Sequence, residues 1–102
     1  MKTEIWYNIQ DGQDGSVSID FFESKGLAEA DDRNEIKCFD YSYAEDSNIG
    51  SIIIDSQAPI NIHGLITKKS KIKELEEKIM RANKHGWKAE EEEAYLLDIE
   101  SL

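Results

Sequence analysis

The spacing of apolar residues changes along the chain, and this change constrains the fold more than any other feature of the sequence. Over residues 3–9, apolar and polar side chains alternate, and a period of two is typical of a half-buried β-strand. After Thr67 the apolar side chains recur at helical spacing, as in Ile72, Leu75 and Ile79, which indicates an amphipathic α-helix. The sequence therefore predicts a strand-rich first part followed by helices.

Three segments of the first part are expected to form strands. Residues 3–9 and 17–22 alternate and are joined by a turn-rich stretch with two glycines, which predicts an antiparallel hairpin with a long loop. Residues 51–55 are rich in isoleucine and bounded by turn residues, so we expect a buried central strand there. Residues 36–43 also alternate and suit either a strand or an ordered loop, and residues 60–62 suit a short edge strand.

A short helix is predicted after the hairpin. Ser24 is a candidate N-cap, because its hydroxyl can accept a hydrogen bond from a free amide of the first helical turn. The helix would run from Lys25 to Asn34 and bury Leu27 and Ala28.

The last third of the chain predicts two antiparallel helices joined by a tight turn. Thr67 or Ser70 can cap the first of them, Gly86 can end it in a left-handed conformation, and Glu90 begins the second. We expect this αα-hairpin to pack on the sheet through five apolar side chains: Ile72, Leu75, Ile79, Leu96 and Ile99.

These elements together predict an α+β fold, with a small antiparallel sheet of three to four strands, one short packed helix and a C-terminal αα-hairpin. With 102 residues, the chain has the length of one small domain. We expect residues 1–102 to form that domain, with an acidic, sheet-rich part over residues 1–64 and the αα-hairpin over residues 65–102.

The charge of the chain is concentrated in its first part. Residues 1–64 hold 13 acidic side chains against 4 basic ones, whereas residues 65–102 hold 9 against 8. Such an acidic surface argues against direct binding to nucleic acid or to anionic membranes and favours basic protein surfaces as partners. No apolar run approaches the ~20 residues of a membrane span, and the single cysteine, Cys38, excludes an internal disulfide. We therefore expect a cytoplasmic protein.

The residue types that carry chemistry do not form a recognisable site. A calcium loop beginning at Asp11 would need a carboxylate at its twelfth position, which is Phe22. Cys38 and His63 lie in no nucleophile motif, and they are too far from each other and from His85 along the chain to suggest a zinc site. We expect no catalytic residue, no metal, no cofactor and no enzymatic activity.

The acidic first part suggests a protein-binding surface instead. Carboxylates held on a rigid scaffold can imitate a phosphate backbone and occupy a basic groove, and exposed aromatic side chains are frequent anchors of interfaces. We expect a non-enzymatic binder whose partner is a protein, with a basic nucleic-acid-binding protein as the favoured case. As an alternative, the apolar residues late in the αα-hairpin would make a self-associating structural or adaptor module. The candidate binding residues are Asp31, Asp32, Asp40, Tyr41, Tyr43, Glu45 and Asp46.

Several short motifs follow one another in a defined order over residues 5–65. They are Asp14-Gly15-Ser16, Phe22-Glu23-Ser24, Leu27-Ala28-Glu29, Gly50-Ser51-Ile52 and Ser56-Gln57-Ala58-Pro59-Ile60. In this order the chain resembles a group of small uncharacterised proteins of bacteria and phages. Members often carry a Gly-Trp-Gly-like stretch before the central strand, where this chain has residues 39–43 with the sequence Phe-Asp-Tyr-Ser-Tyr. The resemblance implies a bacterial or phage setting and a cytoplasmic location, but no activity.

Overall fold

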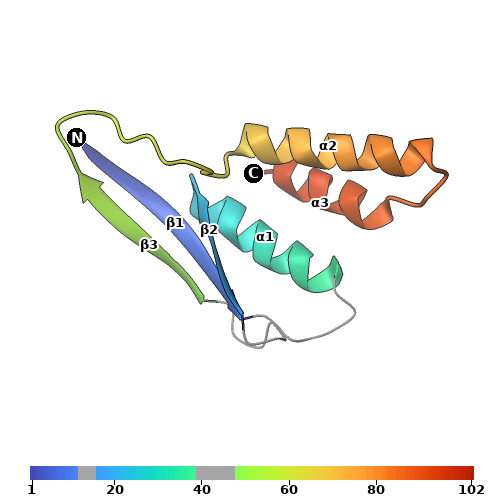
Figure 1. Ribbon diagram of the computed structural model, residues 1–102, viewed down its shortest axis with the longest axis horizontal. Helices are drawn as coiled ribbons and strands as arrows, with labels where there is room; N and C mark the ends of the chain where they lie inside the picture. The colour runs from blue at the N-terminus through green and yellow to red at the C-terminus, as the bar shows by residue number, and fades with distance from the viewer. Residues whose placement is uncertain (12–15, 39–47) are drawn as a thin grey trace.

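The fold belongs to the α+β class, and its described residues form an antiparallel sheet and three helices (Figure 1). The computed structural model describes residues 1–11, 16–38 and 48–102, and within these ranges the side chains of residues 1–9, 16–34 and 48–102. The elements in chain order are β1 (Lys2–Asp11), β2 (Val17–Phe22), α1 (Lys25–Cys38), β3 (Asn48–Asp55), α2 (Lys68–Lys84) and α3 (Glu90–Glu100).

The three described strands form a sheet in the order β2-β1-β3. β1 pairs antiparallel with β2, with Trp6 opposite Phe22, which confirms the predicted hairpin. On its other side β1 pairs antiparallel with β3, with Ile5 opposite Ile52. The prediction that residues 51–55 form a buried central strand is wrong, because β3 is an outer strand and much of Ile53 is exposed.

The two faces of the sheet have different neighbours. α1 lies against the face that carries Trp6 and Phe22, and Phe22 is almost completely buried there. The other face carries Ile5, which is buried, Ile9, which is partly buried, and Ile19, which is largely exposed. Because consecutive side chains of a strand point to opposite faces, the more apolar face of this hairpin is the one that α1 leaves uncovered.

α1 is longer than the sequence predicts. Its N-terminus begins as expected, since the amide of Leu27 donates a hydrogen bond to the Ser24 hydroxyl at 3.3 Å. The helix continues past Asn34 to Cys38, so residues 36–38 are helical rather than part of a strand. The rest of the segment 36–43 lies outside the described residues.

The C-terminal helix pair follows the prediction closely in its boundaries. The Thr67 side chain accepts a hydrogen bond from the Ser70 amide, and the Ser70 hydroxyl accepts one from the Thr67 amide, which completes a capping box. α2 ends at Lys84, and Gly86 follows with φ +72°. A left-handed residue just after the helix is favourable for glycine, which has no Cβ to clash.

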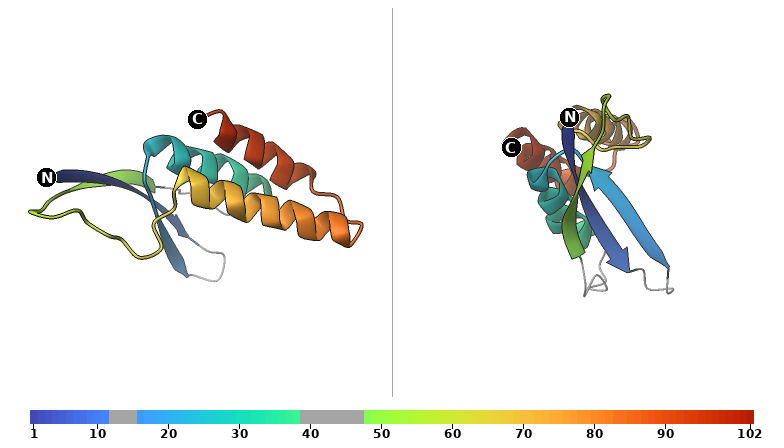
Figure 2. Two further views of the ribbon diagram at one scale, coloured as in Figure 1. Left: turned by 90° about the horizontal axis from the view of Figure 1, so that it is seen from above. Right: turned by 90° about the vertical axis from the view of Figure 1, so that its left-hand side faces the viewer.

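The predicted packing of this helix pair directly on the sheet is wrong, because the pair contacts the rest of the fold mainly where α3 packs on α1. α2 and α3 lie side by side, α3 contacts α1, and α1 contacts β1 and β2 (Figures 1 and 2). The core joins these elements. Its buried members are Phe22, Leu27, Ala28, Ala30, Leu75, Tyr95 and Ile99, with Trp6, Ile49, Ile66, Ile72 and Leu96 packed against them.

Residues 56–67 connect the outer strand β3 to α2 without forming the short strand predicted at residues 60–62. Ile66 ends beside β2, where it accepts a hydrogen bond from the Glu23 amide and donates one to the Phe21 carbonyl. The segment therefore passes from one edge of the sheet to the other. It lies on the side of β1 opposite α1 (Figure 2).

Candidate interaction surfaces

The structure places the seven predicted binding residues in different settings. Asp31 is only 3% exposed and lies inside the helical layer. It therefore cannot present a carboxylate to a partner, and the expectation that it belongs to an exposed array is wrong. Asp32, its neighbour on α1, is partly exposed. The remaining candidates lie outside the described residues: Asp40, Tyr41, Tyr43, Glu45 and Asp46.

Asp31 belongs to a polar cluster that joins all three helices. Its Oδ1 atom accepts a hydrogen bond of 2.8 Å from the Tyr95 hydroxyl of α3 and lies 3.6 Å from Nζ of Lys71 on α2. The Lys71 ammonium also lies 4.8 Å from the centre of the Tyr95 ring and 3.4 Å from Glu74 Oε2. Lys71 and Tyr95 are 5% and 4% exposed. A charged pair is thus shielded from water between the helices.

Burial dominates the electrostatics of this cluster. Desolvation raises the pKa of Asp31 above its ordinary value near 3.8, and the Tyr95 hydrogen bond and the Lys71 charge offset only part of that rise. Glu74 behaves differently: its partial burial alone would raise its pKa, but Lys78 and Lys71 together more than offset this, so its pKa is lowered. The Asp31–Lys71 pair therefore orients the three helices at an electrostatic cost, as buried ion pairs often do.

A second polar contact holds α1 against α3 nearer to solvent. The guanidinium of Arg33 donates to both carboxylate oxygens of Asp98, at 3.0 and 3.1 Å. The amide of Asn34 donates to Asp98 Oδ2 at 2.9 Å and to the Ala30 carbonyl at 2.7 Å. These bonds involve residues that neither periodicity nor composition singled out. They show that the polar side of α1 faces α3.

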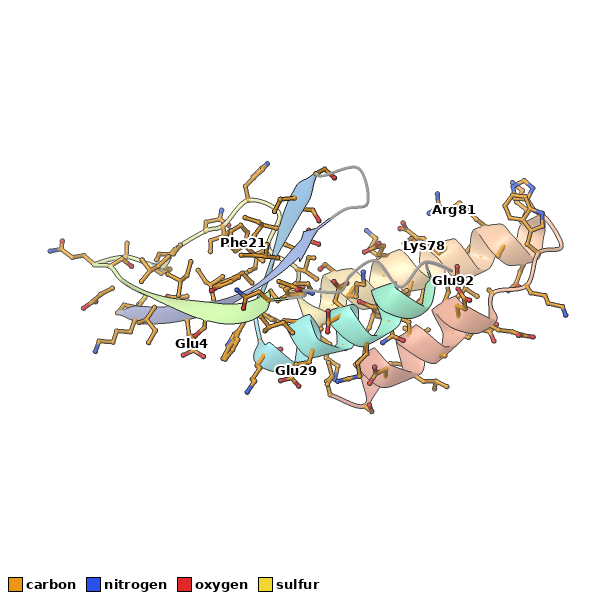
Figure 3. All side chains as sticks on the ribbon, turned by 90° about the horizontal axis from the view of Figure 1, so that it is seen from below. Glu4, Phe21, Glu29, Lys78, Arg81 and Glu92 are labelled. Carbon is orange, nitrogen blue, oxygen red and sulfur yellow. The ribbon has the colours of Figure 1, made fainter. Side chains whose placement is uncertain are left out.

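Most of the acidic side chains lie at the surface, as expected. Among the side chains that the structure describes, Asp31 is the only buried carboxylate. Glu4 on β1 and Glu29 on α1 point outwards on the same side of the molecule (Figure 3). Glu90 to Glu93 occupy the first turn of α3, where the helix dipole favours negative charge.

The aromatic residues are less available than the sequence suggested. Phe22 is part of the core, and Trp6 is partly buried against it with Lys25 Nζ 5.6 Å from its ring centre. Trp87, in the turn between α2 and α3, is 67% exposed and stacks on His85 at 4.8 Å between ring centres. Trp87 is thus an exposed aromatic residue in the described part of the chain, and the turn between α2 and α3 that carries it lies at the end of the helix pair away from the sheet (Figure 1).

The sheet face that α1 leaves uncovered carries no charge among its described side chains. Gly50 lies opposite Tyr7 on this face, and the Tyr7 ring covers the space that a side chain at position 50 would need. A Cβ atom at Gly50 would lie 2.9 Å from Tyr7 Cε2. An aromatic ring laid over a glycine of an outer strand is a recognised way to stabilise such a strand. The full set of described side chains on this face is Thr3, Ile5, Tyr7, Ile9, Val17, Ile19, Phe21, Asn48, Gly50, Ile52 and Ile54.

Replacing Gly50 by alanine is expected to lower the free energy of unfolding by about 1–2 kcal/mol, because the new methyl group displaces the Tyr7 ring. Urea unfolding followed by circular dichroism measures this loss. Ser51→Ala, an exposed neighbour on the other face, is the control and should change stability by less than about 0.5 kcal/mol. In a Tyr7→Ala background the Gly50→Ala change should become neutral or stabilising, since glycine weakens strands. A loss of the same size in both backgrounds would contradict the ring-displacement account.

The described residues contain no arrangement typical of an active site. No three of their His, Cys, Asp and Glu side chains are grouped as metal ligands. A shallow depression on α2 is lined by Glu77, Met80 and Arg81. His63 lies in an exposed turn after β3. None of the helices in the described ranges is long and apolar enough to cross a membrane.

Comparison with known proteins adds no relative. No family model matches the chain, and neither a curated protein nor a solved structure matches it.

Proposed function

We propose that this chain is a non-enzymatic, acidic protein-binding module that covers a basic surface on a partner protein. The observation that carries the proposal is the distribution of its charge. The chain has a net charge of −10, and all described carboxylates other than Asp31 reach the surface. A protein with a basic nucleic-acid-binding groove is the favoured partner, because spaced surface carboxylates can replace phosphates there.

Asp31 is not part of this proposed surface, since it is buried against Lys71 and Tyr95. The proposal retains Asp32, Asp40, Glu45 and Asp46 as the acidic contacts. Tyr41 and Tyr43, which are close to them in the sequence, are retained as aromatic anchors.

The alternative of self-association through the αα-hairpin has less support. Of its late apolar side chains, Tyr95 and Ile99 are buried in the core, and Leu96 packs against it. Leu102 remains 47% exposed. The hairpin thus uses most of this cluster to pack against the rest of the fold.

The experiment that tests the proposal is affinity capture from a bacterial lysate, with bound proteins identified by mass spectrometry. We expect basic nucleic-acid-binding proteins to be retained at about 50 mM salt and released at about 500 mM, where screening is much stronger. The quadruple variant Asp32→Asn, Asp40→Asn, Glu45→Gln and Asp46→Asn should lose this retention.

A matched control removes four charges from the helix pair, at positions where all four side chains are exposed: Glu76→Gln, Glu77→Gln, Glu90→Gln and Glu91→Gln. This variant should retain the same proteins as the wild type. Equal losses in the two variants would mean that only net charge matters, and unchanged retention in the first variant would contradict the assigned surface.

A further inference from the structure

Within the part of the chain that the structure describes, the outer edge of β3 lacks the features that keep exposed strand edges from pairing. Strand edges usually carry charges, prolines or bulges, because their free amide and carbonyl groups pair readily with other strands. From Asn48 to Ile54, β3 contains no charged residue and no proline. Among the described residues β3 pairs only with β1, and its other edge faces away from the helices (Figure 1).

β3 also exposes apolar side chains on both of its faces. Ile52 is 46% and Ile53 is 63% exposed, and adjacent residues of a strand point to opposite faces. An isoleucine run of this kind is typical of a strand with neighbours on both sides. Among the described residues of a single chain, β3 has one neighbouring strand, β1.

The opposite edge of the sheet is better protected. β2 carries the exposed carboxylate of Asp20, and its end is covered by Ile66, which bonds to the backbone of Phe21 and Glu23. A charged side chain and a covering segment are both means of blocking edge pairing. The two edges therefore differ, and β3 is the one suited to an additional strand.

We propose that two copies of this chain associate by pairing the outer edges of their β3 strands antiparallel about a two-fold axis. The two sheets then join into one sheet of six strands, in which β3 occupies the central position that its sequence predicts. The same strand serves as both partners, so the contact is closed and stops at a dimer.

The charge on β3 determines the direction in which a second copy can pair. β3 has a single charged residue, Asp55 at its end. Parallel pairing would place the two Asp55 side chains together, whereas antiparallel pairing centred on Ile52 separates them by about 20 Å along the strands. This distance exceeds twice the Debye length of about 8 Å at physiological salt. Two chains of net charge −10 can therefore meet at this edge without like charges of their β3 strands facing each other. The dimer does not depend on the acidic surface proposed above.

The test is the mass in solution, measured by sedimentation between about 1 and 500 µM in 0.15 M salt. We expect the wild-type mass to rise from 11.7 kDa towards twice that value. Ile52→Lys/Ile53→Lys should stay monomeric, because edge lysines block strand pairing. The control Val17→Lys/Ile19→Lys adds the same charge at 60% and 51% exposed positions of β2 and should dimerise like the wild type.

Three outcomes would overturn the proposal: a wild-type monomer at every concentration, a mass well above the dimer, or a dimer that the β2 variant disrupts as much as the β3 variant. Amide hydrogen exchange of the wild type gives an independent readout that needs no variant. Alternate amides of β3 should be protected at least tenfold more at 500 µM than at 5 µM. Protection that does not change with concentration overturns the proposal as well.

Discussion

Replacing Lys71 by methionine is expected to lower the free energy of unfolding by about 3 kcal/mol at pH 7, because it leaves the buried Asp31 carboxylate without its cation. Methionine retains most of the apolar stem, so the loss arises from charge rather than from a cavity. The loss also has an upper limit. Asp31 can bind a proton instead, which costs about 4 kcal/mol at pH 7 for a group that titrates near 3.8 when unfolded. Equilibrium unfolding in urea measures the change.

Lys78→Met provides a matched control on the same helix. Lys78 also pairs with Glu74, at 3.1 Å, but its side chain is 45% exposed. Surface ion pairs contribute little, so we expect a loss below about 0.5 kcal/mol for this variant. Similar losses for Lys71→Met and Lys78→Met would show that burial of the Asp31–Lys71 pair has no special weight.

The pH dependence separates a charge effect from a packing effect. Burial raises the pKa of Asp31 in the folded state. The contribution of Asp31 to the free energy of unfolding is therefore fully present below about pH 3.8, and it is lost as the pH rises through the folded-state pKa. Without Lys71 the folded-state pKa of Asp31 is higher still, so the free energy of unfolding keeps decreasing up to a higher pH. The difference between wild type and Lys71→Met should therefore be largest near pH 7 and shrink towards pH 4. Asp31→Asn added to Lys71→Met should restore most of the stability at pH 7. A difference that is independent of pH would indicate lost packing instead.

Replacing Phe22 by alanine is expected to cost about 3–5 kcal/mol, the usual loss for a fully buried phenylalanine. Phe22 lies where the sheet meets α1 and belongs to the same cluster as Leu27 and Ile99. Since small domains are stable by only roughly 5–10 kcal/mol, this variant should be close to unfolding. Chemical unfolding at low protein concentration measures the loss in the monomer.

Phe21→Ala is the control that tests which face of β2 packs in the core. Phe21 points to the uncovered face and is partly exposed, so its loss should be about 1 kcal/mol. Phe22→Leu keeps most of the buried volume and should cost less than about 1.5 kcal/mol, which keeps the comparison measurable if Phe22→Ala does not fold. A larger loss for Phe21→Ala than for Phe22→Ala would reverse the assignment of the two faces.

The start of α1 and both ends of α2 were predictable because their signals are local. Ser24, Thr67 and Gly86 each act through hydrogen bonds or dihedral angles within a few residues, and such signals are present in the sequence itself. The antiparallel β1–β2 hairpin was predictable for the same reason, since turn residues join its strands.

The contacts between elements were not predictable in the same way. Periodicity indicates that a strand has two faces, but the face covered by α1 contains Asn8, which is 1% exposed and whose side chain has no hydrogen-bond partner in the described part of the chain. A buried asparagine makes that face look polar in the sequence. Likewise, the Ile52-Ile53-Ile54 run predicts a strand correctly, but its position at the edge depends on which other strands are present.

The sequence predicts that the candidate surface is acidic, but it does not predict which of its carboxylates are exposed. A carboxylate on a helix has the same sequence signature whether it faces solvent or a lysine from another helix. Asp31 lies one turn from Leu27 and Ala28, and Tyr95 and Lys71 approach it only in the folded chain. These contacts join Asp31 to residues more than 39 positions away in the sequence, so no local sequence pattern predicts them.

The strand order β2-β1-β3 has a consequence for synthesis of the chain. β1 is the middle strand, so it needs two partners, and the second of them, β3, follows about 40 residues later, which takes roughly 2–8 s at typical translation rates. The β1–β2 hairpin can form within microseconds, but a two-stranded ribbon is marginally stable by itself. During this interval α1 emerges and can cover one face of the hairpin, while the edge of β1 that later pairs with β3 remains unpaired. Nascent chains of this protein are thus most exposed to mispairing before Asn48 leaves the ribosome.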